Sequence, residues 1–286
     1  MQKIWVCGAR GQIGQAVNDV VDKLEFEMLD TDVDDLDVTD TDEVLRFGEM
    51  NRPDIIINCS GMTDISSCEE NPSQAFKVNA LGARNLAIVA AKMQAKMVQL
   101  STDDVFDGKS TEPYTEFDIT NPGTVYGKSK LAGENYVKEF TTKHFIVRST
   151  WVYGKGQNFI NGFLKKVDAG EQLSIASDQF GSPTSANELA RFLLHLVHTS
   201  EYGTYHATNK GVCSRYAFAQ EILKMTGKTA SMQPVPTVMS DFSKVRPAYA
   251  VLDNFILRIL NMQEMPEWRE SLKIFLKENY GGTRDE

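Results

Sequence analysis

Three residues of this chain have the types and spacing needed to protonate a carbonyl oxygen. Tyr126 and Lys130 are four positions apart, so on a helix their side chains project from one face. An ammonium group beside a phenol favours the phenolate and lowers the pKa of the tyrosine from its usual value of about 10. Thr102 ends an apolar stretch earlier in the chain and can donate a hydrogen bond to the same carbonyl oxygen. We therefore predict that Tyr126 exchanges a proton with a substrate near neutral pH.

A glycine pattern near the N-terminus is typical of dinucleotide binding. Gly8, Gly11 and Gly14 follow an apolar run and open a helix-like segment. Without Cβ atoms the backbone can turn tightly and approach a pyrophosphate, which then lies at the positive end of a helix. A plain glycine turn is the alternative, but the position between strand and helix favours a cofactor site. The predicted cofactor site also includes the intervening residues Arg10, Gln12 and Ile13.

Two residues give opposite indications about the cofactor. Asp32 stands about 20 residues after the glycines, where an acid commonly accepts hydrogen bonds from the adenosine ribose. Arg10 could instead bind the 2′-phosphate of NADP through its guanidinium group. The sequence therefore predicts NADPH or NADH and leaves the choice between them open.

Alternating strand-like and helix-like segments surround these residues. Apolar runs cover residues 3–7, 27–30, 54–58, 97–101 and 145–148. Several lack the polar alternation of a half-exposed strand, which indicates strands covered on both faces. The repeated strand–helix–strand spacing predicts an α/β fold with a Rossmann-like doubly wound parallel sheet.

The regular alternation of strand-like and helix-like segments changes after about residue 151. Helix-like stretches at 158–168, 187–198 and 216–225 are separated by shorter strand candidates such as 203–207. We predict a dinucleotide-binding domain over residues 1–150 that carries the catalytic residues. A smaller C-terminal α/β substrate domain is predicted mainly over residues 151–286, with the chain able to cross back to the first domain.

Composition restricts the classes of partner. The chain has 286 residues with 30 Lys and Arg against 39 Asp and Glu, a formal charge of -9, which disfavours nucleic acid and anionic membranes as partners. Its four cysteines show neither zinc spacing nor disulfide density, and no segment reads as a signal peptide or membrane span. We expect a cytoplasmic protein with a small-molecule substrate and no metal. A homodimer is left open.

The motifs, in their order along the chain, resemble the extended short-chain dehydrogenase/reductase superfamily and, within it, the dTDP-4-dehydrorhamnose reductase family. The resemblance covers nearly the whole chain and includes GARGQIG at 8–14, STD at 101–103, YGKSKLAGE at 126–134 and DQFGSPT at 178–184. It implies NAD(P)H-dependent reduction of a nucleotide-linked 4-keto-6-deoxy sugar, namely dTDP-4-dehydro-L-rhamnose to dTDP-L-rhamnose. Such a reaction would serve the synthesis of cell-surface polysaccharide precursors.

The resemblance also implies roles for matching positions. The catalytic triad would be Thr102, Tyr126 and Lys130, with the last two also contacting the cofactor. The other residues implied for the cofactor are Asp37 and Val38 near the adenine, and Cys59, Ser60 and Gly61 at a strand end. Those implied for the substrate are Thr63, Asp103, Asp104, Trp151 and Arg246, of which Trp151 could equally be interface core and Arg246 a surface ion pair. Asn79 is expected to hold neighbouring backbone.

Two single residues and one five-residue stretch depart from the family pattern. Asp104 stands where tyrosine is usual, residues 62–66 read MTDIS in place of His-Thr-x-Val-Asp, and Ala16 replaces a glutamate that some members use for a metal. The first two leave the identity of the nucleotide and the sugar open. Another sugar-nucleotide reductase is therefore an alternative. Asp104 also keeps a sugar-nucleotide 4,6-dehydratase as an alternative, since Thr102-Asp103-Asp104 resembles the Thr-Asp-Glu triplet of those enzymes. A third reading is a non-catalytic NAD(P)-binding subunit, like the regulatory subunit of methionine adenosyltransferase.

Overall fold

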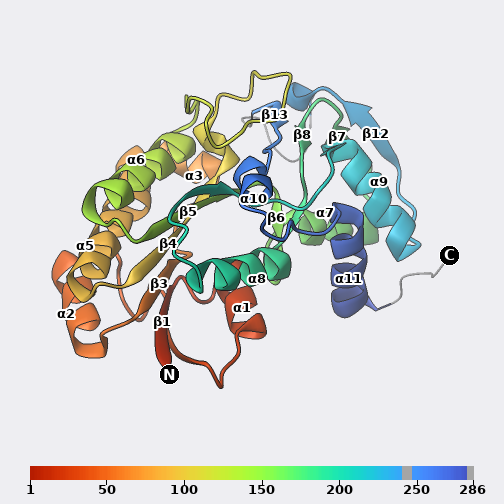
Figure 1. Ribbon diagram of the computed structural model, residues 1–286. Coiled ribbons are helices and arrows are strands. Elements are labelled where there is room, and N and C mark those ends of the chain that lie inside the picture. The colour runs from red at the N-terminus through yellow and green to blue at the C-terminus, as the bar shows by residue number, and fades with distance from the viewer. Residues whose placement is uncertain (240–246, 282–286) are drawn as a thin grey trace.

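A six-stranded parallel sheet forms the centre of the computed structural model, which describes residues 1–239 and 247–281 (Figure 1). Its strands run in the order β10-β5-β4-β3-β1-β2, and every neighbouring pair is parallel. The strands are β1 (Gln2–Cys7), β2 (Phe26–Thr31), β3 (Ile55–Asn58), β4 (Lys96–Thr102), β5 (His144–Ser149) and β10 (Gly203–His206). The predicted fold class is confirmed.

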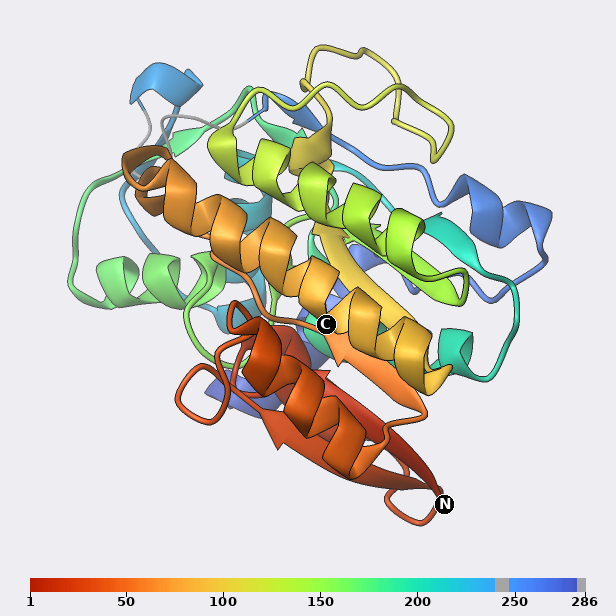
Figure 2. The same cartoon turned by 90° about the vertical axis from the view of Figure 1, so that its left-hand side faces the viewer.

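Helices cover both faces of this sheet. On one face α2 (Thr41–Asn51), α5 (Ala83–Met93) and α6 (Val125–Phe140) lie side by side, as Figure 2 shows. The other face packs against α1 (Gln12–Val20) and α8 (Ala186–Val197). Strand β3 shows why its sequence is apolar throughout: Ile55 and Ile57 join the core on the α1 side, and Ile56 joins the core on the α2 side.

Local signals mark where the helices begin. Asp40 caps α2 by accepting a hydrogen bond from the backbone N–H of Glu43 at 2.9 Å. Helices α4 (Pro72–Phe76) and α5 are joined by a π-helical segment, Lys77–Gly82. Asn79 lies in this wider turn and bonds both the N–H and the C=O of Met62, at 2.8 and 2.9 Å. The prediction that Asn79 holds neighbouring backbone is therefore confirmed.

A second group of elements lies beyond the carboxyl end of the sheet (Figure 1). It has its own apolar core, in which Phe163, Phe218 and Trp268 are almost completely buried. The remaining helices are α3 (Ile65–Glu70), α7 (Phe159–Asp168), α9 (Arg215–Thr226), α10 (Phe255–Ile259) and α11 (Trp268–Tyr280). The remaining strands are β6 (Val152–Tyr153), β7 (Leu173–Ala176), β8 (Phe180–Gly181), β9 (Thr184–Ser185), β11 (Cys213–Ser214), β12 (Met232–Val235) and β13 (Tyr249–Ala250).

The chain returns to the main sheet late in its course. Helix α8 and strand β10 both come from the part of the chain after residue 151. Even so, α8 packs against α1, and β10 pairs with β5. Among the described residues, no helix has the length and apolarity required to cross a bilayer. The division at residue 150 stays a prediction.

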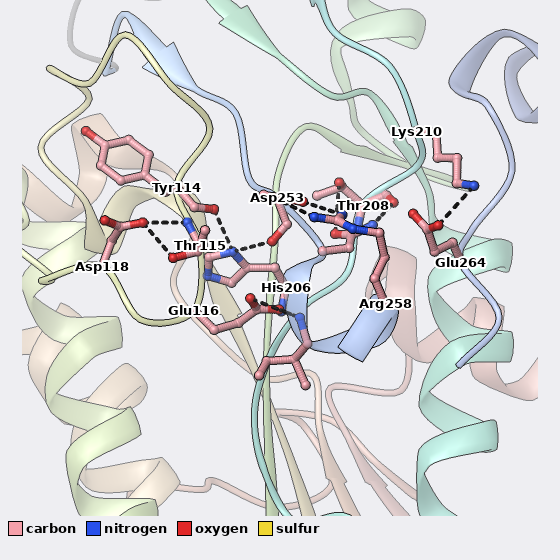
Figure 3. A network of polar contacts seen from close by, with 12 residues as sticks. Tyr114, Thr115, Glu116, Asp118, His206, Thr208, Lys210, Asp253, Arg258 and Glu264 are labelled. Atoms are coloured by element: carbon pink, nitrogen blue, oxygen red, sulfur yellow. Dashed lines mark hydrogen bonds and ion pairs between the residues drawn. The ribbon is translucent and has the colours of Figure 1, made fainter. Parts of the chain in front are cut away.

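Polar contacts attach residues 114–116, which follow β4, to His206 at the end of β10 (Figure 3). The backbone N–H of His206 donates to the Glu116 carboxylate at 2.9 Å, and its Nδ1 lies 3.0 Å from the carbonyl oxygen of Tyr114 and 3.2 Å from that of Asp253. Burial, together with the nearby Arg148, lowers the pKa of His206 to about 3. His206 is thus a neutral structural residue that joins three segments.

Candidate active site

The strand order reverses between β1 and β3, and a cavity of about 800 Å³ opens beside the carboxyl ends of these strands. The chain leaves β1 for β2 on one side and then returns to place β3 on the other side. In open α/β sheets, ligands bind in the crevice at such a point. The cavity is lined from the glycine turn to the second group of elements, so it connects both parts of the chain.

The glycine turn has the geometry required by a close approach of backbone. Gly8 has a φ of +76°, and a Cβ built on it would lie 2.7 Å from the backbone nitrogen of Ser60. A Cβ on Gly14 would lie 2.3 Å from the carbonyl oxygen of Gly8, so α1 packs directly on the turn. Gly11 precedes α1 without capping it through a side chain, and Gly11, Gln12 and Ile13 line the cavity. This uncapped helix end fits the pyrophosphate of a dinucleotide.

Charged residues surround the outer edge of the turn. Asp32 follows β2 and accepts a hydrogen bond from the backbone N–H of Arg10 at 2.8 Å. Asp37 is exposed and bonds the backbone N–H of Thr39, whereas Val38 is buried. Neither Asp37 nor Val38 lines the cavity, and their place near an adenine stays a prediction.

The three residues proposed for carbonyl chemistry line the same cavity. Tyr126 stands in the first turn of α6 and Lys130 in the second, both almost fully buried. Thr124 fixes the start of this helix by accepting a hydrogen bond from the N–H of Gly127 at 2.9 Å. Thr102 ends β4, and its hydroxyl donates to Asp103 at 3.1 Å. The structure therefore brings Thr102, Tyr126 and Lys130 to one site from two elements.

Burial controls the charge of Lys130. Loss of solvent lowers the pKa of its ammonium group to about 8, and the negative charge of Glu134 acts against that effect. Gly61 lies close by, since a Cβ on it would be 3.8 Å from Nζ of Lys130. Cys59 also lines the cavity, and burial raises its pKa to about 12, so its thiol stays protonated. Lys130 is thus mostly a cation at neutral pH, beside a neutral thiol.

A buried ion pair stands behind Lys130. Glu134 is one helical turn further along α6, and its two carboxylate oxygens accept hydrogen bonds from Nε and a terminal nitrogen of Arg148 at 2.8 and 2.7 Å. Ser101 donates to the same carboxylate at 2.6 Å. These bonds hold the pKa of Glu134 below its usual value in spite of its burial. The helix that carries Tyr126 and Lys130 is thereby fixed to β4 and β5.

The far half of the cavity is aromatic and contains one stacked cation. Trp151 has a φ of +46°, a strained conformation for a bulky residue, and strain of this kind is frequent at functional sites. Its indole lies against Gly181, where an added Cβ would be 2.5 Å from a ring atom. The guanidinium of Arg215 lies 3.5 Å from the centroid of the Trp151 ring and 4.8 Å from the centroid of the Phe159 ring. Arg215 and Trp151 both line the cavity.

The residues implied for the substrate are not all brought together. Thr63, Asp103 and Trp151 line the cavity. Asp104 is buried and is not a lining residue, and its backbone carbonyl oxygen would lie 2.0 Å from a Cβ added to Gly127. Arg246 lies outside the described residues. A 4,6-dehydratase would need both acids of the Thr-Asp-Glu triplet at the sugar, so the position of Asp104 argues against that alternative.

Two parts of this site were not predicted from the sequence. Arg215 stands in an ordinary helix start, and no local pattern indicates that it stacks on a residue far away in the chain. Glu134 was noted only within a motif, although its position four residues after Lys130 was a signal that the two charges share a helix face.

Comparisons with known proteins agree with this geometry. The family model described as the RmlD substrate binding domain matches residues 1–280. Among curated proteins, the chain is 34% identical to the spore coat polysaccharide biosynthesis protein SpsK of Bacillus subtilis, covering 97% of this chain and 98% of that one. It is 33% identical to a dTDP-4-keto-6-deoxy-D-glucose reductase of Streptomyces niveus, covering 93% and 94%.

Two solved structures are similar over almost their full length. A dTDP-4-dehydrorhamnose reductase from Clostridium acetobutylicum is 41% identical, with a TM-score of 0.94 and 97% and 99% of the two chains covered. A dTDP-4-dehydrorhamnose reductase from Bacillus anthracis, solved in complex with NADP, is 37% identical, with a TM-score of 0.94 and coverage of 98% and 100%. The chain belongs to the RmlD family, the family of the dTDP-4-dehydrorhamnose reductases.

Proposed function

We propose that this chain reduces the 4-keto group of a dTDP-linked 6-deoxyhexose, converting dTDP-4-dehydro-L-rhamnose to dTDP-L-rhamnose for polysaccharide precursor synthesis. The observation that carries the proposal is the meeting of Thr102, Tyr126 and Lys130 with the glycine turn in one cavity. The family relatives support the same reaction. The bound nicotinamide, NADH or NADPH, would supply the hydride for the keto carbon.

The side chains of this protein supply the proton and position the oxygen. Tyr126 donates its phenolic proton to the carbonyl oxygen as that oxygen becomes an alkoxide. Thr102 would turn its single hydroxyl proton from Asp103 to the same oxygen, and a donor placed at the developing charge lowers the barrier. Lys130 remains cationic at neutral pH and stabilises the phenolate that Tyr126 leaves behind.

The other lining residues divide between the two ligands. We assign the uncapped start of α1, with Gly11, Gln12 and Ile13, to the pyrophosphate of the cofactor. Residues at the end of β3, Cys59, Ser60 and Gly61, would support the nicotinamide half. Thr63, Asp103 and Trp151 would contact the sugar nucleotide.

The test is nicotinamide absorbance on mixing the purified chain, dTDP-4-dehydro-L-rhamnose and either NADH or NADPH. We expect rapid oxidation by the native chain. Tyr126→Phe removes only the proton donor, so kcat should fall by about 10²- to 10⁴-fold while the Kd for the cofactor stays the same. Wild-type turnover by this variant would refute the role of Tyr126. Absence of turnover by the native chain, together with recovery of a stoichiometric enzyme partner, would support the regulatory alternative.

A further inference from the structure

The carboxylate at the end of β2 is held in place by backbone. Asp32 accepts hydrogen bonds from the N–H groups of Arg10 and Val33 at 2.8 and 2.9 Å, and its side chain is only 20% exposed. A carboxylate has about four acceptor positions, so two remain for other donors. In this fold the acid after the second strand lies where the adenosine ribose of a dinucleotide binds. Asp32 is therefore oriented to accept hydrogen bonds from ribose hydroxyls.

The cation that could attract a 2′-phosphate lies among acids. The guanidinium of Arg10 lies 3.0 Å from the carboxylate of Asp34, 3.5 Å from that of Asp35 and 3.8 Å from that of Asp32. Three carboxylates thus surround one guanidinium, and the group as a whole is negative. NADPH differs from NADH by a phosphate on this ribose, which carries close to two negative charges at neutral pH.

We propose that this chain selects NADH over NADPH because Asp34 and Asp35 cancel the charge that Arg10 would offer to a 2′-phosphate. The inference rests on the proposed function, in which the glycine turn holds a nicotinamide dinucleotide. It concerns the side chains of this chain and not the family, since the relative from Bacillus anthracis was solved with NADP.

Rotation of Arg10 would not remove the effect. Its ion pairs are exposed, with 56% of the Arg10 side chain and 78% of the Asp34 side chain accessible, and exposed pairs hold a side chain weakly. Arg10 could therefore turn toward a phosphate at little cost. The carboxylates of Asp32, Asp34 and Asp35 lie 3.0 to 3.8 Å from the guanidinium as it stands, well inside the screening length of about 8 Å at physiological salt, so a phosphate that approaches this group meets them as well. Their repulsion offsets the attraction to Arg10 in either rotamer.

Direct binding measurements on the full chain test this preference without turnover. NADH and NADPH are titrated separately, with nicotinamide fluorescence as the readout. We expect the Kd for NADH to be lower than that for NADPH by at least about ten-fold, because the surplus carboxylates repel the doubly charged 2′-phosphate. The ratio of the two Kd values should shrink as salt is added, because screening weakens exposed charges.

The decisive variant is the double substitution Asp34→Asn with Asp35→Asn. It keeps the shape of both side chains and leaves Arg10 with Asp32 alone. We expect the Kd for NADPH to fall about ten-fold, with that for NADH changed less than about two-fold. Asp168→Asn is the matched control, since Asp168 is an exposed acid that pairs with Lys228 in the C-terminal part of the chain; it should leave the ratio unchanged.

Two results would overturn the inference: equal or tighter binding of NADPH by the native chain, or a Kd ratio that the double variant leaves unchanged. Either would leave the proposed reduction standing, because both cofactors supply the same hydride. Failure of the native chain to bind NADH and NADPH alike would overturn both the preference and the proposed function.

Discussion

The charge of Lys130 should lower the stability of the fold, and Lys130→Met measures that effect. The side chain is 5% exposed, and burial lowers its pKa from the usual 10.5 to about 8. That difference corresponds to about 3 kcal/mol by which folding disfavours the charged form. Methionine has a similar length and shape but no charge, so the substitution removes this cost and keeps most of the packing.

The sign of the pH dependence follows from the two pKa values. Below pH 8, Lys130 is charged in the folded and the unfolded chain, and the full cost is present. Between pH 8 and 10.5 the folded chain loses this proton first, so the native protein gains stability relative to the variant. We therefore expect the free energy of unfolding of Lys130→Met to exceed that of the native chain by about 3 kcal/mol at pH 7 and the gap to close above about pH 10.

Urea unfolding at several pH values measures this gap. Lys128→Met is the matched control, because Lys128 is on the same helix but exposed, and surface substitutions usually change stability by less than about 0.5 kcal/mol. Turnover by Lys130→Met should fall steeply at the same time, since the cation that supports Tyr126 is absent. A variant that is no more stable than the native chain at pH 7, or a gap that does not change with pH, would refute the reasoning.

Two further substitutions test the parts that hold the site together. Gly8→Ala should destabilise the chain by about 1–3 kcal/mol and weaken cofactor binding, because Gly8 has a φ of +76° and an added Cβ would lie 2.7 Å from the nitrogen of Ser60. Gly170→Ala is the control in urea unfolding. Gly170 has a similar φ of +71°, but a Cβ added there would have no atom within 4 Å, so this variant measures the effect of φ without the close contact. Glu134→Gln should lower the free energy of unfolding by about 3–5 kcal/mol, because it leaves Arg148 buried and charged without a carboxylate; a loss below about 1 kcal/mol would show that the pair behaves like an exposed one.

Much of the fold could be predicted because its signals are local. The unbroken apolar run of β3 indicated a strand covered on both faces, and the structure places Ile55 and Ile56 in cores on opposite sides. The cap that Asp40 provides for α2 is a signal of the same local kind, because the residue lies next to the helix start that it fixes. The π-helical segment around Asn79 was not predicted, because it depends on side-chain bonds to Met62 on another segment.

In the candidate site, too, local motifs could be predicted and contacts between distant residues could not. The glycine turn at Gly8 and the spacing of Tyr126 and Lys130 were recognisable because each motif is contained in a few consecutive residues. The stacking of Arg215 on Trp151 was not, since 64 positions separate them and nothing near either residue indicates the contact.

By itself, the sequence determined the order of strands and helices, the tight turn at Gly8 and the pairing of Tyr126 with Lys130 on one helix face. These properties follow from periodicity, glycine geometry and spacing within single elements. Only the tertiary structure decided that Lys130 is buried, that Arg10 lies among three carboxylates and that β10 completes the main sheet. Burial and local charge depend on residues far apart in the chain, so they are fixed by packing and not by any local pattern.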